Sequence, residues 1–376
     1  KPFFTHQLFE GDHITGCESD DEVRIRVMFG SLSLACLVKI TFKGNSDNPR
    51  AQGILSHLSK ALPEGHTTCV ETFTAQLHKQ RDFVLPGEKI HEYTRESNRF
   101  SVRRGTGRDK AVREYHKRTE RLALWYIEAA DSIDLSDDRW EIFLIFQEAT
   151  SEECYDAALV GYFTVFNFRN PVKGVSFRIC QALILPLFQR QGHGTSVLML
   201  LYHLARSREV VWEITVEDPA PGFSKVRNMV DAQVLLYHKV FHEDRLSLTT
   251  FQRPGKEELQ DACKVTTSPD VGAGKSIQSQ PDLFHHQHAH DISMRICFIT
   301  SSNTCPGFDI LKARGIKSSN KEMLKMYRLM VKRRLFKLHQ EELSNNSTTR
   351  KQQLEEMYRE VEIEYMQLAR KIVEEV

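Results

Sequence analysis

The hydrophobic pattern between residues 113 and 241 switches repeatedly between two periods. Short apolar or alternating runs, bounded by turn-forming residues, predict strands at 140–146, 160–168, 179–185 and 210–216. Apolar residues spaced three and four apart predict helices at 113–130, 195–206 and 223–241. Because strands and helices alternate here, we expect an α+β domain with a mixed, twisted sheet flanked by helices.

The first hundred residues have a different pattern, typical of a small mixed domain. Val23–Val27 alternates apolar residues with arginine, and Leu34–Phe42 is a second strand-like run that ends at a polar turn sequence. We therefore expect a hairpin-bearing sheet within a domain at 1–104. Gly105-Thr106-Gly107, flanked by arginines without interleaved aromatic residues, predicts a solvated loop that leads into a domain at 105–242.

The composition and the hydrophobic pattern of the chain change twice within its C-terminal third. Thr, Ser, Gly, Pro and Gln dominate 264–282, which predicts a flexible insert near 264–290 within a helical region at 243–340. In the last segment, 341–376, apolar residues recur at heptad spacing and predict a helix. The seam is short, which leaves docking on the same chain and dimerisation as equal alternatives. Its members are Leu354, Tyr358, Val361, Tyr365, Leu368 and Ile372.

The amino-acid composition of the chain narrows the classes of function that it can have. The 51 basic and 50 acidic residues give a net charge of +1, which provides no overall attraction to nucleic acid. Eight cysteines without CxxC pairs indicate reduced thiols in a nuclear or cytoplasmic protein. No apolar run approaches the roughly 20 residues that span a bilayer, so we expect no membrane partner. The histidines at 285–290 lack carboxylate or cysteine partners, and we expect no metal site.

The most informative stretch is a glycine turn between the strand at 179–185 and the helix at 195–206. Its residues are Gln189, Arg190, Gln191, Gly192, His193, Gly194 and Thr195. A helix start presents unpaired backbone N–H groups, and glycines let an anion approach closely, so the turn is suited to a phosphate. Dinucleotide and Walker chemistry are excluded, because Gly-x-Gly-x-x-Gly and a following Lys-Ser/Thr pair are both missing.

The pattern Gln-x-x-Gly-x-Gly resembles the coenzyme A motif of the GNAT acetyltransferases, which lies between their fourth strand and third helix. Other segments resemble the type B histone acetyltransferase catalytic subunits in particular, and the resemblance covers most of residues 1–242. They are Thr5–Phe9, Gly30–Ser33, Arg113–His116, Trp125–Glu128, Asp138–Trp140, Leu183–Leu185 and Ile214–Pro219. Since the chain begins at Lys1, inside the family's N-terminal domain, we expect a truncated start.

The resemblance implies acetyl-CoA as co-substrate, with its pyrophosphate on Gln189 to Thr195. The pantetheine arm would pair with the backbone of Ala182, Leu183 and Ile184, a run that by itself is equally typical of an ordinary core strand. No metal is needed for the transfer.

Acetyl transfer to a lysine amine requires a base, because neutralising an amine with a reference pKa of about 10.4 at pH 7 costs about 4.6 kcal/mol. Glu217, at the end of the strand at 210–216, is the predicted base. The resemblance implies supporting roles for Asp218 and Glu128. Taken alone, Asp218 before Pro219 is also typical of a turn, and Glu128 of a surface helix.

The resemblance also implies the substrate and the partners. In the family, the segments that match Gly11, Asp12 and His13, and Phe166, Asn167 and Phe168, contact the histone tail. The expected substrate is free histone 4, with histone 2A as a second candidate, and the expected companion is a WD-repeat histone chaperone, in the nucleus and cytoplasm. A GNAT enzyme for another protein or a small amine, and a non-catalytic assembly subunit, are the alternatives.

Overall fold

The computed structural model describes residues 2–6, 23–42, 50–149, 157–172, 174–237, 306–316 and 320–374. The chain divides into two compact units, one made of Lys1–Phe168 with Phe177–His193, the other of Arg169–Ser176 with Gly194–Val376. The predicted insert near 264–290, including its histidines, lies outside the described residues. The expected domain boundaries at 104, 242 and 340 stay predictions.

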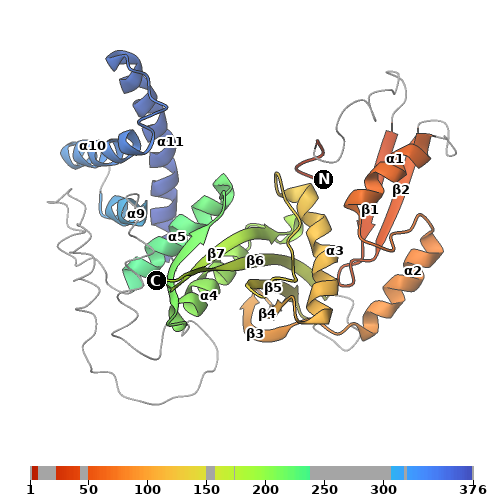
Figure 1. The fold of residues 1–376 in the computed structure, drawn as a ribbon. Helices are drawn as coiled ribbons and strands as arrows, with labels where there is room; N and C mark the ends of the chain where they lie inside the picture. The colour runs from red at the N-terminus through yellow and green to blue at the C-terminus, as the bar shows by residue number, and fades with distance from the viewer. Residues whose placement is uncertain are drawn as a thin grey trace. The chain divides into compact units, whose positions relative to one another are not determined.

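Figure 1 shows the helices and strands of the described chain. The strands are β1 (Val23–Phe29), β2 (Cys36–Phe42), β3 (Glu88–Arg95), β4 (Asn98–Thr106), β5 (Trp140–Gln147), β6 (Ala158–Asn170), β7 (Gly174–Ile184) and β8 (Val211–Val216). The helices are α1 (Arg50–Leu58), α2 (Val70–His78), α3 (Lys110–Tyr126), α4 (His193–Ser207), α5 (Pro221–Tyr237), α9 (Pro306–Arg314), α10 (Lys321–Leu338) and α11 (Ser347–Glu374). The expected α+β class, with a mixed sheet and flanking helices, is confirmed.

The strands form two sheets. β1 and β2 pair as an antiparallel hairpin with Val27 opposite Val38, as the alternating pattern predicts. The larger sheet has six strands in the order β3-β4-β5-β6-β7-β8, and its first three ladders are antiparallel. Strand β6 is buried over most of its length, because its apolar residues point to both faces of the sheet, which is typical of a central strand.

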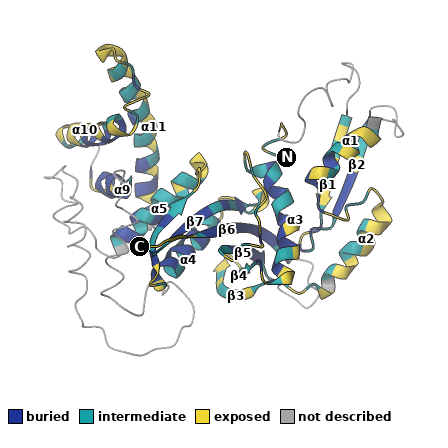
Figure 2. Cartoon of the chain, in the orientation of Figure 1, coloured by how far each residue is buried: buried dark blue, intermediate teal, exposed yellow. Residues whose placement is uncertain are grey.

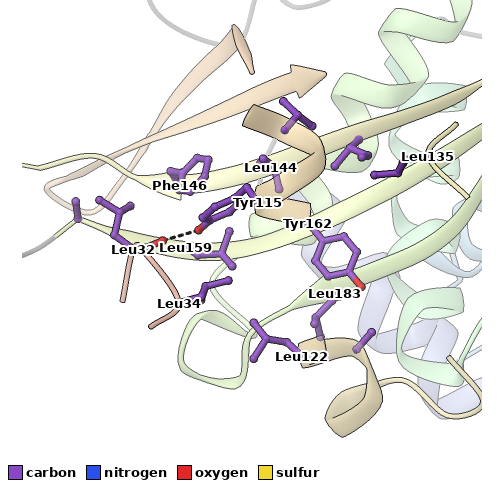
Figure 3. Packing of buried hydrophobic residues seen from close by; sticks show 14 residues of the cluster. Leu32, Leu34, Tyr115, Leu122, Leu135, Leu144, Phe146, Leu159, Tyr162 and Leu183 are labelled. Atoms are coloured by element: carbon purple, nitrogen blue, oxygen red, sulfur yellow. Dashed lines mark hydrogen bonds between the residues drawn. The ribbon is translucent and has the colours of Figure 1, made fainter. Parts of the chain in front are cut away.

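Helix α3 joins two hydrophobic cores of the first unit. Asp109 caps its N-terminus by accepting hydrogen bonds from the backbone N–H groups of Ala111 and Val112. One face of α3 packs on β5, β6 and β7, where Tyr115 also donates a 2.7 Å hydrogen bond to the carbonyl of Leu32 (Figure 3). Trp125, near the other end, packs with β2 and α1. Helix α3 therefore ties the small hairpin to the main sheet.

The predicted loop at Gly105-Thr106-Gly107 is partly wrong. Gly105 and Thr106 are the last residues of β4, and only Gly107 lies beyond the strand. A Cβ atom at position 105 would lie 2.4 Å from the side chain of Val112, and one at position 107 would lie 1.6 Å from the carbonyl oxygen of Leu135. These glycines are needed for close packing rather than for a turn.

The C-terminal helices form the outer part of the second unit. Helix α9 packs on α5 and α11, and most of its residues are buried (Figure 2). Buried Asp309 of α9 pairs with Arg334 of α10 at 2.9 Å, and Arg334 donates a 2.7 Å hydrogen bond to the hydroxyl of Tyr365 in α11. The heptad residues Tyr358, Tyr365, Leu368 and Ile372 are buried within this chain, which favours docking on the same chain over dimerisation.

Candidate active site

The glycine turn has the predicted position between a strand and a helix. Strand β7 ends at Ile184, a 3-10 helix spans Pro186–Phe188, and α4 begins at His193. The side-chain amide of Gln189 donates a 2.8 Å hydrogen bond to the carbonyl of Ile184, and that of Gln191 donates to Leu187 at 2.9 Å. Both glutamine side chains therefore hydrogen-bond the turn to the residues directly before it.

Two residues of the turn have a left-handed backbone conformation. Arg190 has φ 63° and Gly192 has φ 85°. A Cβ atom at position 192 would lie 3.4 Å from Nε of Arg95, whose guanidinium reaches the turn from the end of β3. Glycine at this position thus relieves backbone strain and leaves space beside a cation, two conditions that suit an anionic ligand.

His193 packs against Tyr93 of β3 and Phe100 of β4 in the larger sheet. Its imidazole is only 1% exposed, its Nδ1 lies 2.8 Å from the hydroxyl of Tyr93, and its ring packs edge-on against Phe100 at 4.5 Å between centroids. Burial, with a smaller contribution from the charge of Arg95, lowers the pKa of His193 to about 4. The side chain is therefore neutral at pH 7 and serves the fold rather than supplying a charge to a ligand.

Strand β7 approaches β6 closely at the residues predicted to bind the pantetheine arm. Leu183 is buried against the α3 side of the sheet, while Ala182 and Ile184 are half-buried. A Cβ atom on Gly161 of β6 would lie 2.1 Å from the carbonyl oxygen of Leu183, so only glycine permits this spacing. Strand β6 also changes register against β5 between Ile145 and Phe146. The cofactor strand is thus positioned by features of its neighbours.

Helix α3 ends at Tyr126 rather than at the predicted residue 130, so Glu128 lies beyond the helix and is exposed. Its neighbour Ala129 has φ 52°, a left-handed conformation that is rare outside glycine. The loop that follows is tied to β7, because the side chain of Gln181 donates a 2.7 Å hydrogen bond to the carbonyl of Asp131 and accepts one of 2.8 Å from Tyr162. The structure therefore brings the Glu128 loop to the segment that contains Ala182.

Glu217 and Asp218 follow β8 directly and belong to the second unit. Both residues are exposed, and Asp218 has φ 34°, again left-handed. Helix α5 begins soon afterwards at Pro221. The predicted convergence of Glu128 with Glu217 joins residues of different units and stays a prediction.

The predicted peptide-contacting residues of β6 lie in a cluster of aromatic and cationic side chains. Phe166 packs against Trp140 at 4.8 Å and against Phe168 at 4.5 Å, and the guanidinium of Arg178 lies 4.2 Å from the Phe168 ring. Phe168 is 39% exposed, whereas Phe166 is buried. This leaves Phe168 as the aromatic residue of the pair that an external segment can contact.

Asn167 is held between these aromatic residues by polar contacts. Its amide donates hydrogen bonds to the carbonyl of Arg139 at 3.0 Å and to the carboxylate of Glu141 at 2.8 Å. Glu141 is buried and pairs with Arg104 at 2.5 Å. The other predicted tail-binding residues, Gly11, Asp12 and His13, lie outside the described residues.

Several residues around the site belong to no motif or pattern that would have identified them from the sequence. Arg95 and Gln181 lie far along the chain from the residues that they contact, and neither belongs to a recognisable motif. Arg227 and Asp231 of α5, which contact β8 and α4, are ordinary charged residues in a helical pattern. Only knowledge of which strands are neighbours could have identified them.

Two further observations concern the part of the chain that the structure describes. No three His, Cys, Asp or Glu side chains there come together as a group that could hold a metal ion. None of the helices described is long and apolar enough to cross a membrane.

Comparisons with known proteins agree with the resemblance of the motifs. The family model "Histone acetyl transferase HAT1 N-terminus" matches residues 1–128. A protein of Mus musculus and one of Homo sapiens, each named "Histone acetyltransferase type B catalytic subunit", are 27% and 26% identical over 402 aligned residues, covering 100% of this chain and 88% of each relative. A similarly named protein of Dictyostelium discoideum is 30% identical over 271 residues, covering 69% of this chain and 57% of the relative.

Proposed function

We propose that this chain, which belongs to the family of type B histone acetyltransferase catalytic subunits, is a histone 4 acetyltransferase. It transfers acetyl groups from acetyl-CoA to lysines in the tail of free histone 4. The observation that carries the proposal is the glycine turn at the start of α4. There a left-handed Gly192 leaves space next to the guanidinium of Arg95. The pyrophosphate of acetyl-CoA would occupy this space, held by backbone N–H groups and by the Arg95 charge.

The acetyl end of the donor would lie along β7. Backbone groups of Ala182 to Ile184 offer hydrogen bonds to the amides of the pantetheine arm, in the manner of an added strand. Gly161 keeps β6 close to this segment, and Gln181 anchors the loop that carries Glu128. The thioester is already activated, so the enzyme needs no covalent nucleophile.

The lysine amine would attack the thioester directly after it loses its proton. Glu217 acts as the general base, either directly or through one water molecule, because it follows β8 immediately and its exposed carboxylate can reach an incoming substrate. One ammonium proton passes to Glu217, the amine forms the new amide bond, and the C–S bond breaks; the second proton lost from the nitrogen neutralises the leaving thiolate as coenzyme A. We assign supporting roles in this step to Asp218 and Glu128.

The substrate tail would contact Phe168 and the residues around it. The exposed ring of Phe168, stacked with Arg178, offers an apolar surface to the stems of lysine side chains. The tail of histone 2A is a second candidate. We also propose a WD-repeat histone chaperone as companion, and activity in the nucleus and cytoplasm, where free histones occur.

The test is an acetylation assay followed by mass mapping of the modified lysines. The protein is incubated with labelled acetyl-CoA and tail peptides of each core histone, with small amines such as spermidine as the alternative substrates. The proposal expects the label on lysines of the histone 4 peptide. Labelling of small amines with equal efficiency would contradict the assignment of a histone substrate.

A further inference from the structure

A chain of polar side chains within the second unit leads from α4 through α5 to the strand before Glu217. The hydroxyl of Tyr202 in α4 donates a 2.8 Å hydrogen bond to Oδ1 of Asp231. Nε of Arg227 lies 4.0 Å from Oδ2 of Asp231, one helical turn away on α5. The Arg227 guanidinium then donates a 3.3 Å hydrogen bond to the carbonyl of Ile214 in β8. The chain therefore ends three residues before Glu217.

These groups are largely removed from water. Tyr202 is fully buried, and the side chains of Arg227 and Asp231 are 25% and 13% exposed. A charged group in such a place is retained only when partners replace its lost hydration. Here each group has a partner on another element, so the arrangement fixes the distance between α5 and β8.

Helix α5 also contacts the start of α4. A Cβ atom on Gly194 would lie 4.0 Å from Cγ1 of Val226, the residue directly before Arg227. One helix thus contacts both the end of the predicted cofactor turn and the strand that carries the predicted base. A displacement of α5 would change the position of both.

We propose that Arg227 is a positioning residue, which holds the C-terminal half of β8 so that Glu217 reaches the substrate amine, and that Asp231 and Tyr202 hold Arg227 in turn. The inference rests on the proposed function, because Glu217 must be the base for its position to matter. Arg227 acts through the backbone of Ile214, and displacements of about 1 Å in a reacting group lower rates by up to roughly 100-fold.

The arrangement also depends on pH. Burial raises the pKa of Asp231 to about 6, although the neighbouring charge of Arg227 opposes the shift. The titratable and charged groups that face its carboxylate are Arg227 from α5 and Tyr202 from α4. At pH 7 the carboxylate is charged and holds the guanidinium, and as the pH falls through about 6 that charge is lost. Positioning of β8 should weaken over the same interval.

The first experiment measures kcat and KM for Arg227→Met with acetyl-CoA and the histone 4 peptide. We expect kcat to fall roughly 10- to 100-fold while both KM values change by less than about twofold, since Arg227 itself bonds to β8 and not to the cofactor turn. Arg227→Lys should restore part of the rate, because an ammonium can still donate to the Ile214 carbonyl. Lys225→Met is the control, a loss of an exposed cation from the same helix, and should leave kcat unchanged.

A double-mutant cycle separates positioning from a general loss of structure. If Arg227 acts through Glu217, Arg227→Met should have little further effect on kcat in a Glu217→Gln background. Rate losses that multiply would overturn the proposal. Should Arg227→Met fail to fold, Asp231→Asn, which keeps the shape and the hydrogen bond from Tyr202, enters the same cycle. Because asparagine lacks the charge at every pH, we expect its kcat to be lowered throughout and to lack the fall near pH 6 that Asp231 causes, and an unchanged pH profile would equally overturn the proposal.

Failure of this inference is distinguishable from failure of the proposed function. If Glu217→Gln itself leaves kcat unchanged, the proposed base is wrong, and the positioning role of Arg227 is overturned with it. If Glu217→Gln is impaired and the Arg227 and Asp231 variants match the wild type, only the positioning role is wrong.

Discussion

Strained backbone conformations adjoin the predicted catalytic and cofactor-binding residues. Among the described residues, five other than glycine have positive φ, and three of them are Ala129, Arg190 and Asp218. Ala129 follows Glu128, Arg190 lies in the glycine turn, and Asp218 follows Glu217. A left-handed residue other than glycine costs on the order of 1 kcal/mol or more, and such strain gathers at functional sites. The backbone therefore supports the choice of these segments as the site.

At the scale of single residues, we predict that Gly192→Glu abolishes binding of acetyl-CoA. The new carboxylate would meet the Arg95 guanidinium and occupy the space of the pyrophosphate, and the left-handed backbone would be strained as well. Calorimetric titration with acetyl-CoA checks this result. Gly53→Glu, at an exposed glycine of α1 with open space around it, is the control and should bind normally. Unchanged affinity in folded Gly192→Glu would show that the ligand lies elsewhere.

Arg95→Ala should weaken acetyl-CoA binding without abolishing it. The guanidinium supplies one charge-assisted contact to the phosphate, and hydrogen bonds to charged groups contribute about 1.5–3 kcal/mol, equivalent to roughly 10- to 150-fold in affinity. The loss should shrink as salt concentration rises, because Arg95 is exposed. Arg99→Ala, an exposed arginine of the neighbouring strand, serves as the comparison. Equal losses of acetyl-CoA affinity in the two variants would show that Arg95 acts only through general electrostatic attraction.

The buried His193 should make stability depend on pH. Its folded pKa of about 4 lies below the usual value near 6.5, so the unfolded chain binds a proton first as the pH falls. The stabilisation is complete above pH 6.5 and is lost between about 6.5 and 4, by up to about 3 kcal/mol. Urea unfolding of the wild type and of His193→Gln checks this, since glutamine can keep the contact with Tyr93 but does not titrate. Parallel pH curves for the two proteins would contradict it.

At the scale of elements, the sequence predicted the catalytic core better than its surroundings. Strands β5 to β8 and helices α3 to α5 follow clear hydrophobic periods, so most of their predicted ends agree with the structure to within four residues, although β7 begins at Gly174 rather than at the predicted residue 179. The N-terminal helices and the hairpin of β3 and β4 were not predicted individually. Strand β3 is exposed and polar along much of its length, so it lacks the alternation that a one-sided strand usually shows.

The role of β3 and β4 could not be read from local pattern. Gly105 and Thr106 look like turn residues, yet they end β4 because they pair with Ile142 and Glu141 of β5, and Val112 of α3 packs against Gly105. In the same way, the buried contact between His193 and Tyr93 joins residues a hundred positions apart. Such long-range pairs depend on strand order, which the sequence alone did not determine.

For the C-terminal helices, we predict that Arg334→Ala strongly destabilises the second unit. The side chain of Arg334 is 5% exposed, pairs with a fully buried Asp309 and donates a hydrogen bond to Tyr365, so its loss would remove a buried ion pair and a contact between α10 and α11. Removing one partner of a buried pair costs about 3–5 kcal/mol. Limited proteolysis and thermal unfolding measure the effect, and Arg333→Ala, at the adjacent exposed position, should behave as the wild type. Matching stability of both variants would contradict the structure.

At the scale of the whole molecule, the proposed substrate is free histone rather than assembled chromatin. The net charge of +1 gives the chain no general attraction to DNA, so nucleosomes offer it no electrostatic advantage. We expect acetylation of histone 4 when it is free or bound to a WD-repeat chaperone, and much slower acetylation of reconstituted nucleosomes. The initial rates on the two substrates at equal histone concentration decide the matter. Equal rates would contradict the type B assignment of the substrate.

The most direct test of the account is the rate of Glu217→Gln on the histone 4 peptide. This variant keeps the shape of the side chain and removes its ability to accept a proton. We expect kcat to fall by about 10² to 10⁴, with acetyl-CoA affinity nearly unchanged, and to recover partly as rising pH deprotonates the lysine in solution. Asp218→Asn and Glu128→Gln should lose less, and Glu209→Gln, an exposed carboxylate before β8, should lose nothing. A wild-type rate in Glu217→Gln, or a larger loss in Asp218→Asn or Glu128→Gln, would contradict the assignment of Glu217 as the base.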